Sequence, residues 1–502
     1  MIESLSKNQG LPEKRRNQLM FLLMIVATLA FRVFYVSHQG FVADLSHFND
    51  DALITFRYAQ NIAAGEGFVY NPGEKVMGTT TPLYALLLAI PALFDFDLMW
   101  ASFIINAVAD CLAVCLILFI VQDRPVLQFI SASLYLSHPG IIVWSANGME
   151  MSLFVLLGLL TTYLFYSDRF GLAGIGAALL LICRIDGALL LGAIALASVL
   201  RRRNPFPVKY VAALIMFLLP WVFFSLVYFG TPIPQSAQAK LVAYSFIGID
   251  RFNIWRIHVF DVLLVLPACI GGAYLVFNLR KGQASSQLWC LLALSFWFLI
   301  QGLFFTFLPT SVVIYGWYRV PQHMVFSLLA AMGLTYMLEK LYKYAPINPA
   351  LTQRSAFPTR LVTLIVVFIA FVGFSIVKDG VVPAPSSTQM HLAVGQWLNL
   401  HAKPSDTVMA GNIGYIGYFS QCRVLDDVGL VSPQVLPIIV DHGGWGGSLV
   451  ETFKPEYLAL DKREVENIGE DFIESQGYLL VARYHYSGSR QSPYSVYERV
   501  DK

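Results

Sequence analysis

The sequence predicts an all-α polytopic membrane domain followed by a small C-terminal α/β domain. The chain has 502 residues, of which 57% are hydrophobic and 13% are charged, and its mean hydropathy is +0.61. A soluble protein of this size needs more polar surface, so most of the chain is expected to face lipid. Apolar runs of membrane-spanning length recur as far as residue 377, and only shorter ones follow.

The first apolar segment, Gln18–Val36, follows Lys14, Arg15 and Arg16. At about 19 residues it is long enough to span a bilayer. No small-residue cleavage site follows it. We therefore expect a retained crossing that begins in the cytoplasm, and not a cleaved signal peptide.

Further apolar runs are candidates for the remaining crossings: 83–94, 98–121, 126–143, 151–166, 171–182, 185–200, 208–229, 259–278, 287–308, 321–338 and 361–377. Lys and Arg are enriched in cytoplasmic loops, so the basic clusters at 201–203, 280–281 and 340–343 are expected inside. This orientation places 230–258, 309–320 and everything after Lys378 outside. The total is about eleven crossings.

The chain before Glu150 contains one apolar run too many for this orientation. Residues 37–82 and Glu150 are both expected outside, so an even number of crossings must separate them. Three runs occur there, 83–94, 98–121 and 126–143. One of them does not cross, or two form a single crossing, and the sequence leaves this choice open.

Residues 385–502 have a different pattern, with strand-length apolar runs at Thr407–Ala410, Tyr457–Leu460 and Tyr478–Ala482. His391–Leu400 has helical spacing of its apolar residues. The expected division is a membrane domain over 1–384, with a first external loop at 37–82, and an extracytoplasmic α/β domain over 385–502.

Composition excludes several classes of protein. A formal net charge of +2 is too weak to indicate a nucleic-acid partner. Five of the six cysteines fall in apolar segments, and only Cys422 lies in the C-terminal region. No disulfide framework and no zinc-ligand spacing is therefore expected.

The most informative stretch is the polar loop at 48–83, FNDDALITFRYAQNIAAGEGFVYNPGEKVMGTTTPL. Asp50 and Asp51 are expected at the start of a helix that runs to about Ala64, where a carboxylate stabilises the positive end. Capping alone explains Asn49 and Asp50, but two adjacent carboxylates exceed that need. One is free to act as a general base, or both hold a divalent cation such as Mg or Mn, so Asp50 and Asp51 are also the candidate metal ligands.

Other charged residues are expected on the same outer face. Glu150 precedes an apolar helix and is a candidate second acid. Arg184 lies in a turn before Asp186, and these two residues form either a structural ion pair or a functional one. Lys240 ends a loop stiffened by two prolines, and Arg319 lies in an aromatic cluster that an interfacial belt also explains.

Together these residues suit displacement of a lipid phosphate from a sugar. A carboxylate deprotonates the incoming hydroxyl, and Arg or Lys neutralises the departing phosphate oxygens. The lipid tail would lie between helices in the bilayer.

The first loop resembles that of bacterial GT-C-type membrane glycosyltransferases, in the arabinofuranosyltransferase-like and mannosyltransferase-like branch that uses polyprenyl-phosphate sugars. The blocks SANGMEMSLF, CRIDGALLL, GTPIPQSAQAK, WYRVP and NIGYIGYFSQCRVLDDVGL look like that branch's blocks in the same order. The resemblance covers nearly the whole chain. Ile185 and the Pro234-Gln235 pair depart from the branch, and these departures leave the substrate open.

The resemblance implies that Asp50 or Asp51 is the catalytic carboxylate, that Glu150 is the second acid, and that Lys240, Arg319, Arg184 and Arg57 bind the donor phosphate. It implies a substrate pocket with Tyr58, Thr80, Gln235, Tyr318 and His323. The expected location is the bacterial inner membrane, and the expected partners are the bilayer, a polyprenyl-phosphate-linked sugar, and a glycan, lipid or protein acceptor.

Two other functions remain open at this point. A transporter or flippase favours charges in the middle of helices and repeated broken helices, whereas here the charges lie at helix ends. A non-enzymatic assembly factor would use the external domain, for example the loop 443–447, to bind a partner.

Overall fold

The structure is a computed structural model that describes residues 47–122, 124–243, 253–255, 259–281, 285–307, 316–344, 386–442, 446–485 and 493–500, with seven residues between 22 and 33. The predicted first crossing lies largely outside the described residues, and the predicted crossing at 361–377 lies wholly outside them. The same holds for 443–445 of the glycine-rich loop.

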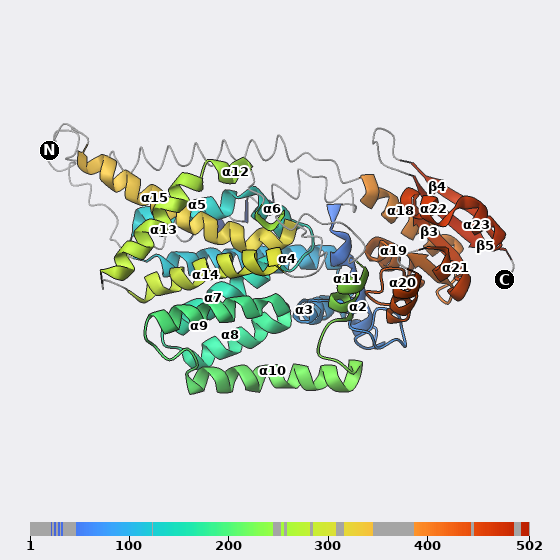
Figure 1. The fold of residues 1–502 in the computed structure, drawn as a ribbon, viewed down its shortest axis with the longest axis horizontal. Helices are drawn as coiled ribbons and strands as arrows, with labels where there is room; N and C mark the ends of the chain where they lie inside the picture. Colours follow the sequence, from blue (N-terminus) through green and yellow to red (C-terminus); the bar gives the residue numbers. More distant parts are fainter. Residues whose placement is uncertain are drawn as a thin grey trace, which may run out of the picture.

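The first part of the chain is a bundle of helices (Figure 1). Its members are α3 (Pro82–Ala92), α4 (Leu98–Ile120), α5 (Pro125–Ser137), α6 (Pro139–Ala146), α7 (Met151–Tyr166), α8 (Phe170–Cys183), α9 (Ala188–Leu200), α10 (Val208–Phe229), α12 (Val259–Val262), α13 (Val265–Arg280), α14 (Ser286–Phe307) and α15 (Val320–Tyr344). Helix α4 packs on α7, α8 on α10, and α13 on α15. An all-α membrane-type domain is therefore confirmed.

Among the described residues, α4, α10 and α14 are long and apolar enough to cross a membrane. A fourth crossing is counted if α5 and α6, which are bent by 56° at their junction, form one span. Five further apolar helices are shorter, so the prediction of about eleven crossings is not confirmed. With 11 residues, α3 rises about 16 Å, roughly half the thickness of the hydrocarbon core. This length favours 83–94 as the run that does not cross.

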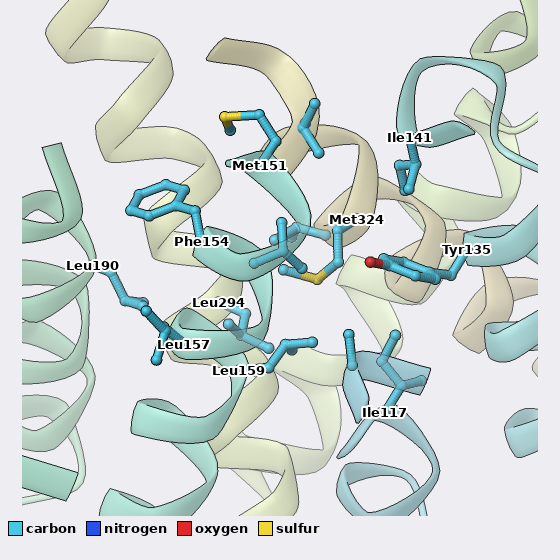
Figure 2. Packing of buried hydrophobic residues seen from close by; sticks show 14 of the residues in the cluster. Ile117, Tyr135, Ile141, Met151, Phe154, Leu157, Leu159, Leu190, Leu294 and Met324 are labelled. Carbon is cyan, nitrogen blue, oxygen red and sulfur yellow. The ribbon is translucent and has the colours of Figure 1, made fainter. Parts of the chain in front are cut away.

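The interior of the bundle is packed with large apolar side chains (Figure 2). Phe154 and Leu157 of α7 lie among Ile117 of α4, Leu294 of α14 and Met324 of α15, all of them buried. The outer face of α10 is the opposite case. Its Met216, Phe223 and Val227 side chains are 66–72% exposed, which is typical of a surface that faces lipid.

The C-terminal part is a small α/β domain at one end of the bundle (Figure 1). Its strands are β1 (Thr407–Ala410), β2 (Arg423–Asp426), β3 (Tyr457–Asp461), β4 (Tyr478–Tyr484) and β5 (Tyr494–Arg499), and its helices are α18 (Ser386–His401), α19 (Ile413–Ser420), α20 (Leu436–His442), α21 (Gly447–Phe453), α22 (Lys462–Ile468) and α23 (Glu470–Ser475). The five strands have the order β2-β1-β3-β5-β4. Strands β1, β2 and β3 are parallel, and β5 is antiparallel to β3 and β4.

The predicted strands of this domain are confirmed as β1, β3 and β4, and the predicted helix lies within α18. Strands β2 and β5 were missed. Their apolar residues alternate with polar ones over only four to six positions, as in RVLD and YSVYER, which is a weak signal for a strand.

Helix α19 joins the two parts of the molecule by packing on α2 (Asp50–Ala63), the helix of the first loop. Two glycines of α19 allow this approach. A Cβ on Gly414 would lie 1.8 Å from the Asp50 carbonyl oxygen, and one on Gly417 would lie 1.7 Å from the Tyr70 hydroxyl. A side chain at 414 would push α19 away from α2, and one at 417 would displace the Tyr70 hydroxyl and the Arg57 guanidinium group.

Candidate functional site

Two cavities meet at the junction between the bundle and the α/β domain. The upper cavity has a volume of about 560 Å³ and is lined by Asn49, Asp50, Asp51, Ile54, Lys240, Trp317, Met409, Gly411, Asn412, Ile413, Asp427, Val428, Leu430, Gly446, Leu449, Asp461, Arg463, Glu464, Asn467 and Ile468. The lower cavity, of about 30 Å³, is lined by Asp51, Ile54, Thr55, Gly78, Thr79, Thr80, Thr81, Met149, Glu150, Arg184, Ser236, Lys240, Trp317, Tyr318 and Leu430. The charged residues common to both are Asp51 and Lys240.

Asp51 and Lys240 form an ion pair at this meeting point. The Lys240 Nζ lies 3.6 Å from the Asp51 Oδ2, and the two side chains are 13% and 33% exposed. Asp51 lies in the first turn of α2, and Lys240 lies near the end of α11 (Gln235–Ala243). A carboxylate and an ammonium group that both reach the cavities can contact a bound substrate.

Local hydrogen bonds explain how α2 and α11 present this pair. Asn49 is the N-cap of α2, and its Oδ1 accepts a hydrogen bond of 3.0 Å from the Asp51 N–H. Of the residues expected to cap this helix, Asn49 is the N-cap, and both aspartates lie in the first turn as expected. The Asp51 carboxylate is therefore not needed as the cap. Gln235 donates from its N–H to the Met77 carbonyl and from Nε2 to the Gly429 carbonyl, which fixes the start of α11.

Asp50 has a different environment from its neighbour. Its Oδ2 accepts from the Gly414 N–H and its Oδ1 from the Tyr415 N–H, both at 2.9 Å, at the N-terminus of α19. Burial raises the pKa of this carboxyl group to about 6, although the two N–H donors oppose the shift. Both oxygens are thus used to hold the α/β domain.

Arg57 and Tyr58 also serve the junction. Arg57 donates to the Gly417 carbonyl at 2.8 Å and to the Cys422 carbonyl at 2.6 Å, and its guanidinium group lies 4.3 Å from the Tyr70 ring centre. The Tyr58 hydroxyl donates to the Val76 carbonyl and accepts from the Gly78 N–H. Neither residue lines the two cavities, so the structure does not bring them to the place predicted for donor phosphate and substrate.

Glu150, Arg184 and Asp186 form a buried charged group beside the lower cavity. Arg184 donates through Nη1 to the Glu150 Oε1, and through Nε to the Asp186 Oδ1 at 2.9 Å. Its guanidinium group lies 5.1 Å from the Tyr318 ring centre. Two carboxylates already neutralise this one cation, so Arg184 has less positive charge to offer a phosphate than Lys240 has.

The other predicted residues divide into two groups. Thr80, Tyr318, Glu150 and Arg184 line the lower cavity together with Asp51 and Lys240. Among the residues that the structure describes, Gln235, Arg319 and His323 line neither cavity. Neighbouring Thr55, Thr79 and Thr81 hydroxyl groups lie 3.1–3.2 Å apart and hold the loop that carries Thr80.

His323 belongs to a separate buried group with His138 and Asp261, whose ligating atoms lie within 4.8 Å of one another. His138 Nε2 lies 2.8 Å from the Asp261 Oδ1, and His323 Nδ1 lies 3.4 Å from the Oδ2. The Gly140 N–H donates to His138 Nδ1. That nitrogen therefore carries no proton in a neutral ring, so Nε2 carries it and donates to Asp261. This tautomer suits a hydrogen-bonded group better than a metal site.

The expected cation site at Asp50 and Asp51 does not fit the contacts of these residues. Mg²⁺ and Mn²⁺ need several free oxygen ligands, and both Asp50 oxygens already accept backbone N–H bonds. Asp51 alone then offers a carboxylate, and it faces Lys240.

Three acidic residues of the upper cavity were missed by the sequence analysis. Asp427 follows β2, Asp461 ends β3, and Glu464 lies in α22. Asp461 and Glu464 form a capping box, in which each side chain accepts from the backbone N–H of the other. The D-x-x-E spacing of DKRE is a readable signal for that helix start, but it does not indicate a cavity.

Comparisons with solved structures identify the fold. The crystal structure of ArnT from Cupriavidus metallidurans bound to undecaprenyl phosphate matches with a TM-score of 0.57 and 12% identity, over 95% of this chain and 97% of that one. The apo form of ArnT matches with a TM-score of 0.54 and 12% identity, over 96% of this chain and 98% of that one. The chain has the GT-C glycosyltransferase fold.

The mycobacterial arabinofuranosyltransferase AftD matches with a TM-score of 0.50 and 14% identity, over 95% of this chain but 41% of that one. A family model described as a domain of unknown function, DUF8728, matches residues 382–497. No curated protein sequence matches the chain. At 12–14% identity these likenesses concern the fold, and the activity is argued separately below.

Proposed function

We propose that this protein is a membrane glycosyltransferase that moves a sugar from a polyprenyl-phosphate donor to an acceptor outside the cytoplasm. The observation that carries the proposal is the Asp51–Lys240 pair, at 3.6 Å, where the two cavities meet. The ArnT structure of similar fold binds undecaprenyl phosphate, which supports a lipid phosphate as the donor's leaving group.

In this mechanism Asp51 is the general base. Its carboxylate takes the proton of the acceptor hydroxyl, and the acceptor oxygen forms a bond to the anomeric carbon as the bond from that carbon to the phosphate oxygen breaks. The donor leaves as polyprenyl phosphate, and a single displacement of this kind inverts the anomeric configuration. The Lys240 ammonium group neutralises the negative charge that develops on the phosphate.

The residues of the lower cavity lie beside the Asp51–Lys240 pair and would contact the part of the donor that reaches it. Thr80 and Tyr318 offer hydroxyl groups, and the buried Arg184 holds Glu150 in place beside them. Asp50 and Arg57 are assigned to domain docking because of their bonds to α19, in place of the catalytic and phosphate-binding roles expected from the sequence. The proposal gives no substrate contact to three further residues expected from the sequence, because they line neither cavity: Arg319, Gln235 and His323.

The same proposal includes an orientation and a location. The chain would be a multi-pass protein of the bacterial inner membrane, with its N-terminus in the cytoplasm. Residues 1–384 would form the membrane domain, and 385–502 the extracytoplasmic domain that closes over the donor. This arrangement puts Asp51 at the outer surface of the bilayer, where a lipid-linked sugar is accessible.

The position of the cavities argues against a transporter, and the charged pair argues against a scaffold. A transporter needs its substrate site near the middle of the membrane, and a scaffold needs no aligned carboxylate and ammonium group. The cavities lie instead at the end of the bundle, under the α/β domain. We therefore retain the transferase as the single proposed function.

The test uses the full chain in lipid nanodiscs. The donor is a radiolabelled lipid extract from cells that lack the gene, and the acceptor is the membrane and wall fraction of the same cells. Wild-type protein should transfer label to the acceptor fraction, and Asp51→Asn should lower the rate about 10²–10⁴-fold. Retention of full activity by Asp51→Asn would overturn the catalytic assignment. Vesicle uptake of the label without transfer would favour a transporter.

A further inference from the structure

We propose that the wall of the upper cavity formed by the α/β domain is the acceptor subsite, and that it takes a phosphate-free, polyhydroxyl glycan end. This inference rests on the proposed function, because it divides the cavities between two substrates. The donor phosphate would lie beside Lys240, where the two cavities meet, and the acceptor would enter from the sheet side.

The position of this wall in the sheet is the first support. Strands β1, β2 and β3 are parallel and neighbouring, so their carboxyl ends meet at one edge. Gly411 and Asn412 follow β1, Asp427 follows β2, and Asp461 ends β3. In open α/β sheets ligands bind outside the carboxyl ends of parallel strands. These residues all line the cavity that contains Asp51.

One buried acceptor oxygen at this edge has no donor, and a Glu464 oxygen lies near it. Asp427 is only 5% exposed, and its Oδ1 has no hydrogen-bond donor among the described residues. A Cβ on Gly411 would lie 3.0 Å from this Oδ1 and 2.8 Å from the Glu464 Oε1, so both oxygens approach the same point. Glu464 Oε2 is already used by the Asp461 N–H at 2.6 Å. The Asp427 Oδ1 is therefore satisfied either by a proton shared with Glu464 or by a donor from outside the chain.

The acidic residues of the wall favour a ligand with hydroxyl groups over one with a phosphate group. Burial and then the neighbouring acids raise the pKa of Glu464 to about 7 and that of Asp427 well above its usual value. Around neutral pH the pair therefore holds a proton and offers both a donor and acceptors, as sugar hydroxyl groups require. A phosphate group would meet Asp427, Asp461 and Glu464 with only the exposed Arg463 as a nearby cation of the wall. Lys240 lies at the junction with the lower cavity, beside Asp51.

The size of the cavity agrees with this assignment. Its volume of about 560 Å³ lies inside the range of roughly 300–1,000 Å³ that is typical of ligand sites. The lower cavity, at about 30 Å³, is too small for a glycan end. A glycan end in the upper cavity would place a hydroxyl group beside Asp51.

The experiment separates acceptor binding from donor chemistry. Full-length wild-type protein, Glu464→Gln and Asp427→Asn are reconstituted in nanodiscs with the radiolabelled donor extract. Transfer is measured against increasing amounts of delipidated acceptor fraction. Without acceptor, release of label from the donor is measured as slow hydrolysis, in which water takes the place of the acceptor hydroxyl. Glu466→Gln is the matched control, since Glu466 lies on the same helix, is 61% exposed and pairs with Lys462. Glutamine at 464 keeps the oxygen that accepts from Asp461.

We expect each cavity variant to raise the apparent KM for the acceptor at least tenfold, with donor release within twofold of wild type and the control unchanged. Unchanged KM values in both variants would overturn the acceptor subsite while leaving the proposed transferase intact. Absence of donor release and transfer in wild type would overturn the transferase itself. If EDTA raises the acceptor KM of wild type, the wall holds a metal cation in place of a direct glycan contact, and the proposal is overturned. If transfer occurs only to phosphorylated acceptors, the wall is a phosphate site, and the proposal is overturned as well.

Discussion

Asp50 and Arg57 lie seven residues apart on α2 and hold opposite ends of α19. Asp50 accepts from two backbone N–H groups at the N-terminus of that helix, and Arg57 donates to the carbonyl groups of Gly417 and Cys422 at the other end. Residues seven apart lie on one helix face, and the two charges match the two ends of the α19 dipole. The first loop and the α/β domain are therefore one unit.

Replacing Asp50 should loosen the α/β domain, whereas replacing Asp51 should remove catalysis. Asp50→Asn has one acceptor oxygen for two N–H donors, so hydrogen exchange in α19 should become faster. Asp51→Asn should leave this exchange unchanged and lower transfer about 10²–10⁴-fold. Unaltered exchange in Asp50→Asn would contradict the docking role.

Loss of the Lys240 charge should slow transfer. Lys240→Met keeps much of the side-chain volume but removes the cation next to Asp51, so the transfer rate should fall about 10²-fold. Lys240→Arg should recover part of the rate, because it restores the charge. Rates for both variants are measured at saturating donor, and equal rates in wild type and Lys240→Met would exclude a role in stabilising the leaving phosphate.

Removal of Arg184 should destabilise the protein more than it alters the acceptor KM. Arg184→Met leaves the Glu150 and Asp186 carboxylates buried without their cation, a change that costs about 3–5 kcal/mol. Thermal unfolding of the nanodisc-bound chain measures the loss. Asp186→Asn, which keeps the Glu150 contact, is the milder comparison, and equal stability of all three proteins would argue against the buried group.

The glycines of α19 give a steric test of the junction. Gly414→Ala would place a Cβ against the Asp50 carbonyl oxygen, and overpacking of this kind costs about 1–3 kcal/mol. Protease cleavage between the two parts should then become faster. Gly192→Ala is a suitable control, because a Cβ there has no heavy atom within 4 Å. Equal cleavage of both variants would mean that α19 does not pack this closely on α2.

Stability should fall as the pH rises from about 4.5 to 7. The pKa of Glu464 is raised to about 7 in the folded chain, mainly by burial, so the folded state holds a proton that the unfolded state has already lost. By linkage, the free energy of unfolding decreases across that interval. Glu464→Gln should reduce this decrease, as measured from the unfolding temperature of the chain at several pH values. A wild-type curve that rises over the interval would have the wrong sign for this group.

The division into a helical bundle and an α/β domain was predictable from local patterns. Long apolar runs and the basic clusters between them predict helices such as α4 and α14, since apolar length and charge act along the chain itself. The strands β1 and β3 were predictable for the same reason. Strand β5 depends on pairing with β3 and β4, and its own pattern is too short to show this.

For the first loop, the sequence determines which charged residues are present, and the fold determines what each one contacts. The sequence by itself determined that Asp50, Asp51, Glu150, Arg184 and Lys240 are available, because residue type sets their charge. Only the tertiary structure decided which of two adjacent aspartates faces the cavity and which one holds α19. Neighbouring residues on a helix point about 100° apart, so their roles depend on what packs against each face, and here that is a helix more than 350 positions later in the chain.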